Sequence, residues 1–144
     1  IAAGVAVSVK GRSMRKQART ESQHLDAAEA ALTHTNNLLE RIRIWAGKIE
    51  LMLEEATARG RRDVDWMRSL PPQGGALPWT HQSEPVQNRI TVLVSIVATT
   101  ITLLTLPILA VADDQLDEEE VEAVSRWNDL AIADSEKRLD ALLS

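Results

Sequence analysis

The sequence predicts an all-α protein, and three observations support that prediction. Apolar residues recur at helical spacing from Met14 to Ala56, and the stretch from Ile90 to Ala112 runs for 23 residues without a charged side chain. The chain contains no Phe or Tyr, so its core must be built from Leu, Ile, Val and Ala. These side chains suit interdigitating helices better than a β-sandwich. We expect a long heptad-patterned helix, a Pro/Gly-rich loop, one transmembrane helix and a C-terminal acidic amphipathic helix.

The first nine residues, IAAGVAVSV, form an apolar N-terminal stub ahead of a basic cluster. Nine residues are too few to cross a bilayer, because a spanning helix takes about 20. Two interpretations of residues 1–9 stay open. They are either the last turns of an earlier membrane helix that meets a basic cytoplasmic flank, or a frayed apolar terminus or remnant of a signal or linker.

Residues 10–70 are expected to form a long amphipathic helical region. Between Met14 and Ala56, thirteen seam positions alternate in steps of four and three residues, and eleven of them are apolar. A 3.5-residue repeat held over six heptads is typical of a helix that packs lengthwise against partner helices. A second apolar row widens this face, so we expect contact with at least two other helices. The second row consists of Ala31, Leu38, Trp45 and Met52.

The large apolar residues of these two rows are the candidate partner-binding site. Two polar residues, Glu21 and Thr35, interrupt the seam, and we interpret them as register-setting rather than catalytic. The predicted partner contacts are Leu25, Leu32, Leu39, Ile42, Trp45, Ile49 and Leu53.

Residues 71–89 are expected to be a Pro/Gly-rich linker. Pro71 and Pro72 end the preceding helix, and four of the five Pro residues and two adjacent Gly residues lie between residues 71 and 85. The next helix is expected to start between Pro85 and Arg89.

Residues 90–112 are expected to be a transmembrane helix. At a rise of about 1.5 Å per residue they span about 34 Å, slightly more than the hydrocarbon thickness of about 30 Å. The Thr and Ser hydroxyls in the segment are able to bond to carbonyls one turn back at small cost. Two alternatives remain: the buried central helix of a soluble bundle, or a pair of β-strands for which turn residues are missing.

The flanking charges predict a direction for this span. Arg89 and the basic cluster precede it, while Asp113 and Asp114 follow it. The positive-inside rule then places residues 10–89 in the cytoplasm and residues 113–144 on the opposite side.

Residues 113–144 are expected to contain an acidic amphipathic helix from about Glu118 to Leu143. Asp117 followed three residues later by Glu120 is a capping-box pattern at its start. Three consecutive Glu residues in the first turn match the positive end of the helix dipole.

Composition narrows the classes of function. The net charge is +5 over residues 10–20, −2 over residues 21–89 and −8 over residues 113–144. This gradient argues against nucleic-acid binding, because the one basic cluster is short and lies far from any aromatic residue. The absence of Cys excludes disulfides and thiolate metal sites.

No residue pattern in the chain points to a catalytic, cofactor or metal site. Glu21 and His24 form a single Glu-x-x-His step, whereas a di-iron helical bundle needs two such steps and two further Glu residues. No nucleophile elbow, phosphate-binding glycine loop or calcium loop is present. We therefore expect no enzyme activity and no cofactor.

The sequence thus favours a membrane-anchored helical scaffold or accessory subunit that acts by helix–helix association. Its expected partners are membrane lipids and either other helical subunits of a membrane complex or further copies of itself. One alternative is a pore- or channel-forming subunit, in which the hydroxyl-bearing face of residues 90–112 lines a polar path. The other is a soluble helical bundle with residues 90–112 as its buried central helix.

Overall fold

The computed structural model describes residues 2–70 and 78–144, with side chains described from Lys10 onward. Its regular elements are all helices, and no strand occurs among the described residues, so the all-α prediction is confirmed. The chain divides into two compact units, residues 1–40 and residues 41–144.

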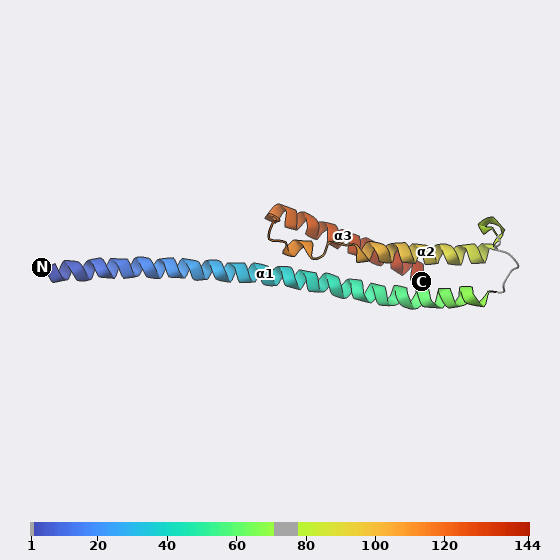
Figure 1. Cartoon of the computed structure of the whole chain (residues 1–144), viewed down its shortest axis with the longest axis horizontal. Coiled ribbons are helices and arrows are strands. Elements are labelled where there is room, and N and C mark those ends of the chain that lie inside the picture. The colour runs from blue at the N-terminus through green and yellow to red at the C-terminus, as the bar shows by residue number, and fades with distance from the viewer. Residues whose placement is uncertain (1, 71–77) are drawn as a thin grey trace. The chain divides into compact units, whose positions relative to one another are not determined.

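Helix α1 spans Ala2–Ser69 (Figure 1). It ends two residues before Pro71, because a residue that precedes a proline is disfavoured in the helical conformation. This end agrees with the predicted boundary at residue 70. Residues 2–9 continue the same helix, and both interpretations of residues 1–9 stay predictions.

The predicted linker is shorter than residues 71–89. Residues 71–77 lie outside the described part of the chain. A short 3₁₀ helix, η1, covers Trp79–His81, and α2 already begins at Glu84. Pro85 occupies the first turn of α2, where its missing N–H costs nothing and its fixed φ angle suits a helix.

Helix α2 spans Glu84–Leu104, so the prediction of one continuous helix over residues 90–112 is wrong at its C-terminal end. Pro107 explains the difference: it has no N–H to donate to the carbonyl of Leu103, and its ring clashes with that turn. The N–H of Leu106 bonds instead to the Leu103 carbonyl, at 3.4 Å. After this break, a 3₁₀ helix, η2, covers Ala110–Ala112.

Helix α3 spans Glu118–Leu143, as the capping pattern predicts. The side chain of Asp117 accepts a hydrogen bond from the Glu120 N–H at 2.8 Å, and the Glu120 side chain accepts one from the Asp117 N–H at 3.0 Å. Two backbone N–H groups at the start of the helix are thereby satisfied by reciprocal bonds.

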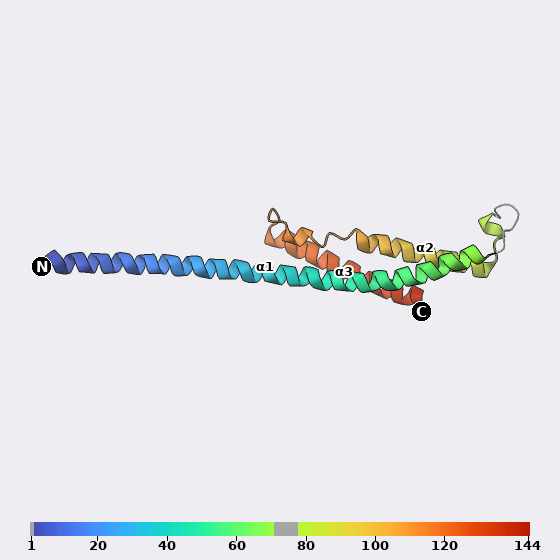
Figure 2. The ribbon, with the colours of Figure 1, turned by 60° about the horizontal axis from the view of Figure 1, so that its bottom comes forward.

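Residues 41–144 form a three-helix unit. Figures 1 and 2 show α2 and α3 along the second half of α1, with α3 running in the direction of α1 and α2 running against it. The core of this unit consists of buried apolar residues from α1 and from the elements that follow it. Those of α1 are Trp45, Ile49, Met52 and Ala56. Those from the rest of the unit are Ile96, Leu103, Val111, Ile132 and Leu139.

In the first unit, residues 2–40 belong to the first part of α1. Every side chain from Arg12 to Asn37 is exposed. A single helix with an uncovered apolar stripe gains little from tertiary packing, which is the main source of helix stability in proteins. The heptad packing and the coiled coil that the sequence predicts for this unit therefore stay predictions.

Candidate interaction surfaces

Hydrogen bonds between polar side chains join α1 to α3. The indole Nε1 of Trp45 donates to Oδ1 of Asp129 at 2.7 Å, and a guanidinium nitrogen of Arg41 donates to Oγ of Ser125 at 2.6 Å. Glu122 adds an ion pair to Arg41 at 3.7 Å, in which Glu122 is exposed and Arg41 is half-buried. These contacts set the register of α3 on α1.

The structure separates the predicted partner-binding residues into two groups. Leu25, Leu32 and Leu39 are 71%, 65% and 55% exposed, so they are available to a partner. Trp45 and Ile49, by contrast, are 2% and 8% exposed. Their assignment as partner contacts is corrected, because the chain's own helices already cover them.

The remaining two predicted contacts, Ile42 and Leu53, are half-buried. Leu53 lines an open groove of about 620 Å³ beside α1, together with Ala46, Ile49 and Ile108. Charged residues also line this groove, namely Glu50, Glu54 and Arg61.

Helix α2 has one covered face and one exposed face. Ile96, Thr99 and Leu103 are buried in the three-helix unit. The opposite face carries large aliphatic side chains that are between 49% and 66% exposed: Val94, Val97, Ile101 and Leu104. The expectation of a central helix surrounded by the chain's own helices is therefore not met.

The hydroxyl groups of α2 are used within the helix. Thr91, Ser95 and Thr99 donate to the carbonyls of residues 87, 91 and 95, at distances between 2.8 and 2.9 Å. Thr102 and Thr105 donate in the same way, at 3.2 and 3.0 Å. The hydroxyl groups proposed to line a pore therefore donate to carbonyls of their own helix. Thr99 is buried in the core of the unit.

A buried ionic cluster holds the start of α2 against α1. The carboxylate of Asp63, 1% exposed, accepts bonds from Nε of Arg59 at 3.0 Å and from Nε of Arg89 at 2.8 Å. The guanidinium carbon of Arg89 lies 4.2 Å from the ring centroid of Trp66. This contact adds a cation–π attraction to the ion pair.

Burial and the two arginines act on Asp63 in opposite directions. Desolvation acts to raise the pKa of this carboxyl, but the hydrogen bonds from Arg89 and Arg59 and their positive charges outweigh it and hold the pKa below its ordinary value. Asp63 is therefore ionised at neutral pH, and each of its carboxylate oxygens accepts a hydrogen bond from an arginine. No sequence pattern predicted this cluster, since Asp63 and Arg89 meet only through the folding of α2 onto α1.

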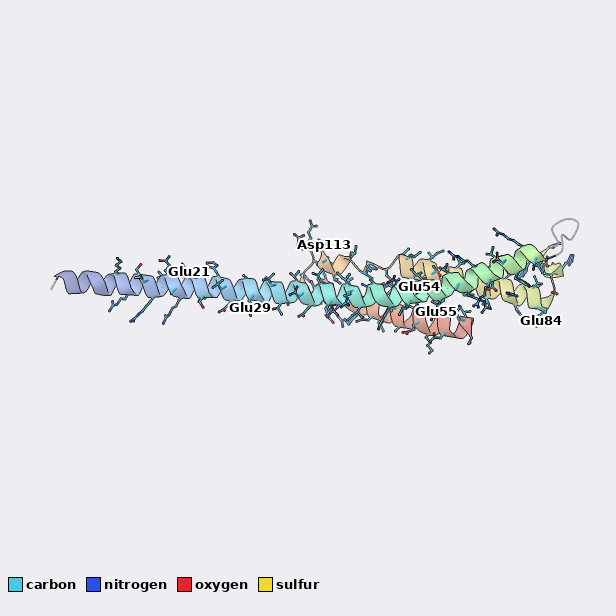
Figure 3. All side chains as sticks on the ribbon, turned by 90° about the horizontal axis from the view of Figure 1, so that it is seen from below. Glu21, Glu29, Glu54, Glu55, Glu84 and Asp113 are labelled. Atoms are coloured by element: carbon cyan, nitrogen blue, oxygen red, sulfur yellow. The ribbon has the colours of Figure 1, made fainter. Side chains whose placement is uncertain are left out.

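Helix α2 is the one helix in the described residues that is long and apolar enough to cross a membrane, and 17% of its most apolar 18 residues are buried. Its neighbours in the structure are charged. Arg61, Asp65 and Arg68 line a groove of about 550 Å³ with Leu93 and Val97. Figure 3 labels Glu54 and Glu55 on the stretch of α1 beside α2 and α3.

These charges conflict with a lipid environment for the packed unit. Each charged side chain at the centre of a bilayer costs about 2.5–3.5 kcal/mol on insertion scales. The bonds from Trp45 and Arg41 to α3 also place residues 41–69 and α3 side by side. The predicted location of residues 113–144 across the membrane from residues 10–89 therefore does not describe this folded state.

No group of three or more His, Asp or Glu side chains within the described part of the chain is arranged to hold a metal ion. Comparison with protein-family models, with curated proteins and with solved structures found no match.

Proposed function

We propose that this chain is a non-catalytic helical scaffold that acts by associating with partner helices. The observation that carries this proposal is the exposed face of α2, on which Val94, Val97, Ile101 and Leu104 lie on one regular helix. A contiguous exposed apolar surface of this kind marks an interaction site or an aggregation liability.

The polar chemistry of the described residues supports association rather than catalysis. The buried carboxylate of Asp63 is paired with two arginines. The buried hydroxyls of Thr99 and Ser125 donate to carbonyls one turn back in their own helices. Each of these groups stabilises helix structure or helix packing, and none is presented at the floor of a groove.

Site-specific photo-crosslinking tests this proposal. A photoreactive amino acid is placed at Val97 or Ile101 of the full chain in the cells that produce it, and at the exposed residue Lys137 as the control. We expect protein adducts of defined mass from the two α2 positions and not from the control. Adducts at all three positions, or at none, would contradict a specific docking face on α2.

Membrane anchoring by α2 is the second candidate function. It is favoured by the length and composition of α2 and by the low buried share of its residues. It requires α2 to separate from α1 and α3, because their charges would otherwise enter the bilayer. In that released state, we propose that residues 10–89 lie in the cytoplasm and residues 113–144 on the opposite side.

A covalent link between α1 and α2 distinguishes the two candidates. A Cβ atom at Gly60 lies 3.9 Å from Cδ1 of Leu93, and the natural chain has no Cys. A Gly60→Cys/Leu93→Cys chain joined by a short bismaleimide keeps α2 on α1. Membrane anchoring predicts that this chain loses resistance to alkaline carbonate extraction, while the same variant blocked with N-ethylmaleimide stays in the membrane. Extraction of both forms would exclude the span.

A further inference from the structure

The first part of α1, residues 10–40, carries an apolar stripe whose large side chains are exposed. Met14, Leu25, Leu32 and Leu39 are between 55% and 71% exposed. In heptad notation, Leu25, Leu32 and Leu39 occupy a positions, and Met14 and Ala28 occupy d positions. A helix with this pattern is stabilised by a second helix along its a and d face.

The charges of this segment exclude a parallel pairing with a second copy. Residues 10–20 contain five Lys and Arg side chains and no acid, so a parallel pair in register would set two such clusters side by side. It would also place Glu21, at a d position, directly opposite Glu21 of the second copy. Like charges in such positions are destabilising.

An antiparallel pairing separates the two basic clusters and no longer sets Glu21 directly opposite Glu21 of the second copy. Residues 21–36 contain Glu21, Asp26 and Glu29 and no Lys or Arg, so a reversed second copy brings an acidic segment beside the basic one. Glu21 and Glu29, labelled in Figure 3, are exposed on α1. We propose that residues 10–36 of α1 form an antiparallel helix pair with the same residues of a second copy. This inference rests on the proposed function of helix association and names its partner.

One register satisfies the seam and the charges together. In an antiparallel pair, each a residue lies opposite a d residue of the other helix. Placing Leu32 opposite Met14 of the second copy also places Ala18 opposite Ala28, and these small side chains allow a close approach of the two backbones. Leu25 then lies opposite Glu21, which is the one charged residue in this overlap of the seams.

The same register pairs opposite charges at the edge of the seam. Arg15 and Glu29 both occupy e positions, and residues at e face each other in an antiparallel pair. Arg15 of each copy therefore meets Glu29 of the other, and the two-fold symmetry makes this ion pair twice. The pairing buries both apolar stripes over about 40 Å of helix.

Disulfide trapping tests this register, because the full chain contains no Cys. Two single variants, Ala18→Cys and Ala28→Cys, are prepared separately and mixed under mild oxidation. The antiparallel pair brings residue 18 of one copy next to residue 28 of the other. It separates two copies of residue 18, or two of residue 28, by about 15 Å along the axis. That distance is beyond the reach of a disulfide.

We expect a disulfide-linked dimer from the mixture and none from either variant alone. Dimers from each variant alone would show a parallel pair and overturn the proposal. A monomer by light scattering at tens of micromolar, with no disulfide in any sample, would also overturn it. Such a result leaves the photo-crosslinking test at Val97 and Ile101 unaffected, so the two proposals fail separately.

A charge exchange provides the second test. At 0.15 M salt, Arg15→Glu or Glu29→Arg alone is expected to weaken dimerisation about five- to tenfold, because two attractive pairs become repulsive. The double variant Arg15→Glu/Glu29→Arg restores it. Glu136→Arg, which changes the charge by the same amount at an exposed position of α3 outside the paired segment, is the control and is expected to change dimerisation less than about twofold. Failure of the double variant to recover would refute the Arg15–Glu29 pairing.

Discussion

Arg89 donates from Nε to Oδ1 of Asp63 across 2.8 Å and thereby joins the first turns of α2 to α1. The carboxylate is 1% exposed, while the side chain of Arg89 keeps 36% of its surface accessible. In the packed state the charges of Arg59 and Arg89 offset the desolvation of this carboxylate, and the bond from Arg89 adds to the contacts that hold α2 on α1. This contact is present in the packed state and is lost in any state in which α2 leaves α1 for a membrane.

Replacing Asp63 is expected to lower the stability of the three-helix unit. Asp63→Asn keeps the shape of the side chain but removes the charge that pairs with both arginines. We expect the free energy of unfolding to fall by about 2 kcal/mol, measured by urea denaturation. Asp65→Asn is the matched control, because Asp65 is exposed and lies 3.9 Å from Arg68. Equal losses from the two variants would contradict a special role for the buried cluster.

The lowered pKa of Asp63 predicts an acid-sensitive contribution to stability. Since this pKa is lower in the folded than in the unfolded chain, the contribution is present above the unfolded value of about 4. It is lost as the pH falls through the folded value. Denaturation midpoints at pH 7 and pH 3 measure the effect. The natural chain is expected to lose more stability on acidification than Asp63→Asn, and parallel losses would refute the assignment.

Substitution of Trp45 is expected to lower the unfolding free energy more than substitution of any other tryptophan. It is 2% exposed and donates to Asp129, so Trp45→Phe removes a hydrogen bond and leaves a small cavity. A loss of about 1–2 kcal/mol in unfolding free energy follows. Trp127→Phe serves as the control, because Trp127 is 64% exposed, and should change stability by less than about 0.5 kcal/mol. The reverse order would show that α3 does not pack on α1 as described.

Asn128 is expected to contribute specificity rather than stability. It is fully buried, its Nδ2 donates to the Pro107 carbonyl at 3.3 Å, and its Oδ1 has no hydrogen-bond partner among the described residues. The Pro107 carbonyl also accepts from the N–H of Ala110, so it stays satisfied in Asn128→Leu.

Thermal and urea unfolding of two substitutions at Asn128 check this expectation. Asn128→Leu should leave the unfolding free energy unchanged or raise it by up to about 1 kcal/mol. Asn128→Asp should lower it by about 3 kcal/mol, because a buried charge is left without a cation. A large loss from Asn128→Leu would show that the unpaired Oδ1 has a partner that the variant removes.

The sequence allowed the existence of each helix to be predicted, and most of their boundaries. The Asp117–Glu120 spacing located the start of α3, and the Pro71–Pro72 pair located the end of α1, because caps and prolines act on the backbone within one turn. The end of α2 was predicted wrongly, because the uncharged stretch continues to Ala112, whereas Pro107 prevents the helix from continuing.

The candidate site was predicted only in part. Apolar periodicity shows which face of a helix is buried, but it does not show whether the same chain or another molecule covers it. Leu25 and Trp45 belong to neighbouring apolar rows of one pattern, yet the first is exposed and the second is packed in the three-helix unit. The ionic cluster could not be predicted, because Asp63 and Arg89 are 26 residues apart and no local pattern links them.

What the sequence determined by itself is therefore the set of helices and their amphipathic faces, since both follow from interactions within a few residues. The tertiary structure decided which apolar residues are covered by the chain's own helices, which charges meet, and that α2 packs beside charged residues of α1. These outcomes depend on contacts between segments that are distant in the sequence, such as the ion pair of Asp63 with Arg89, and no local pattern encodes those contacts.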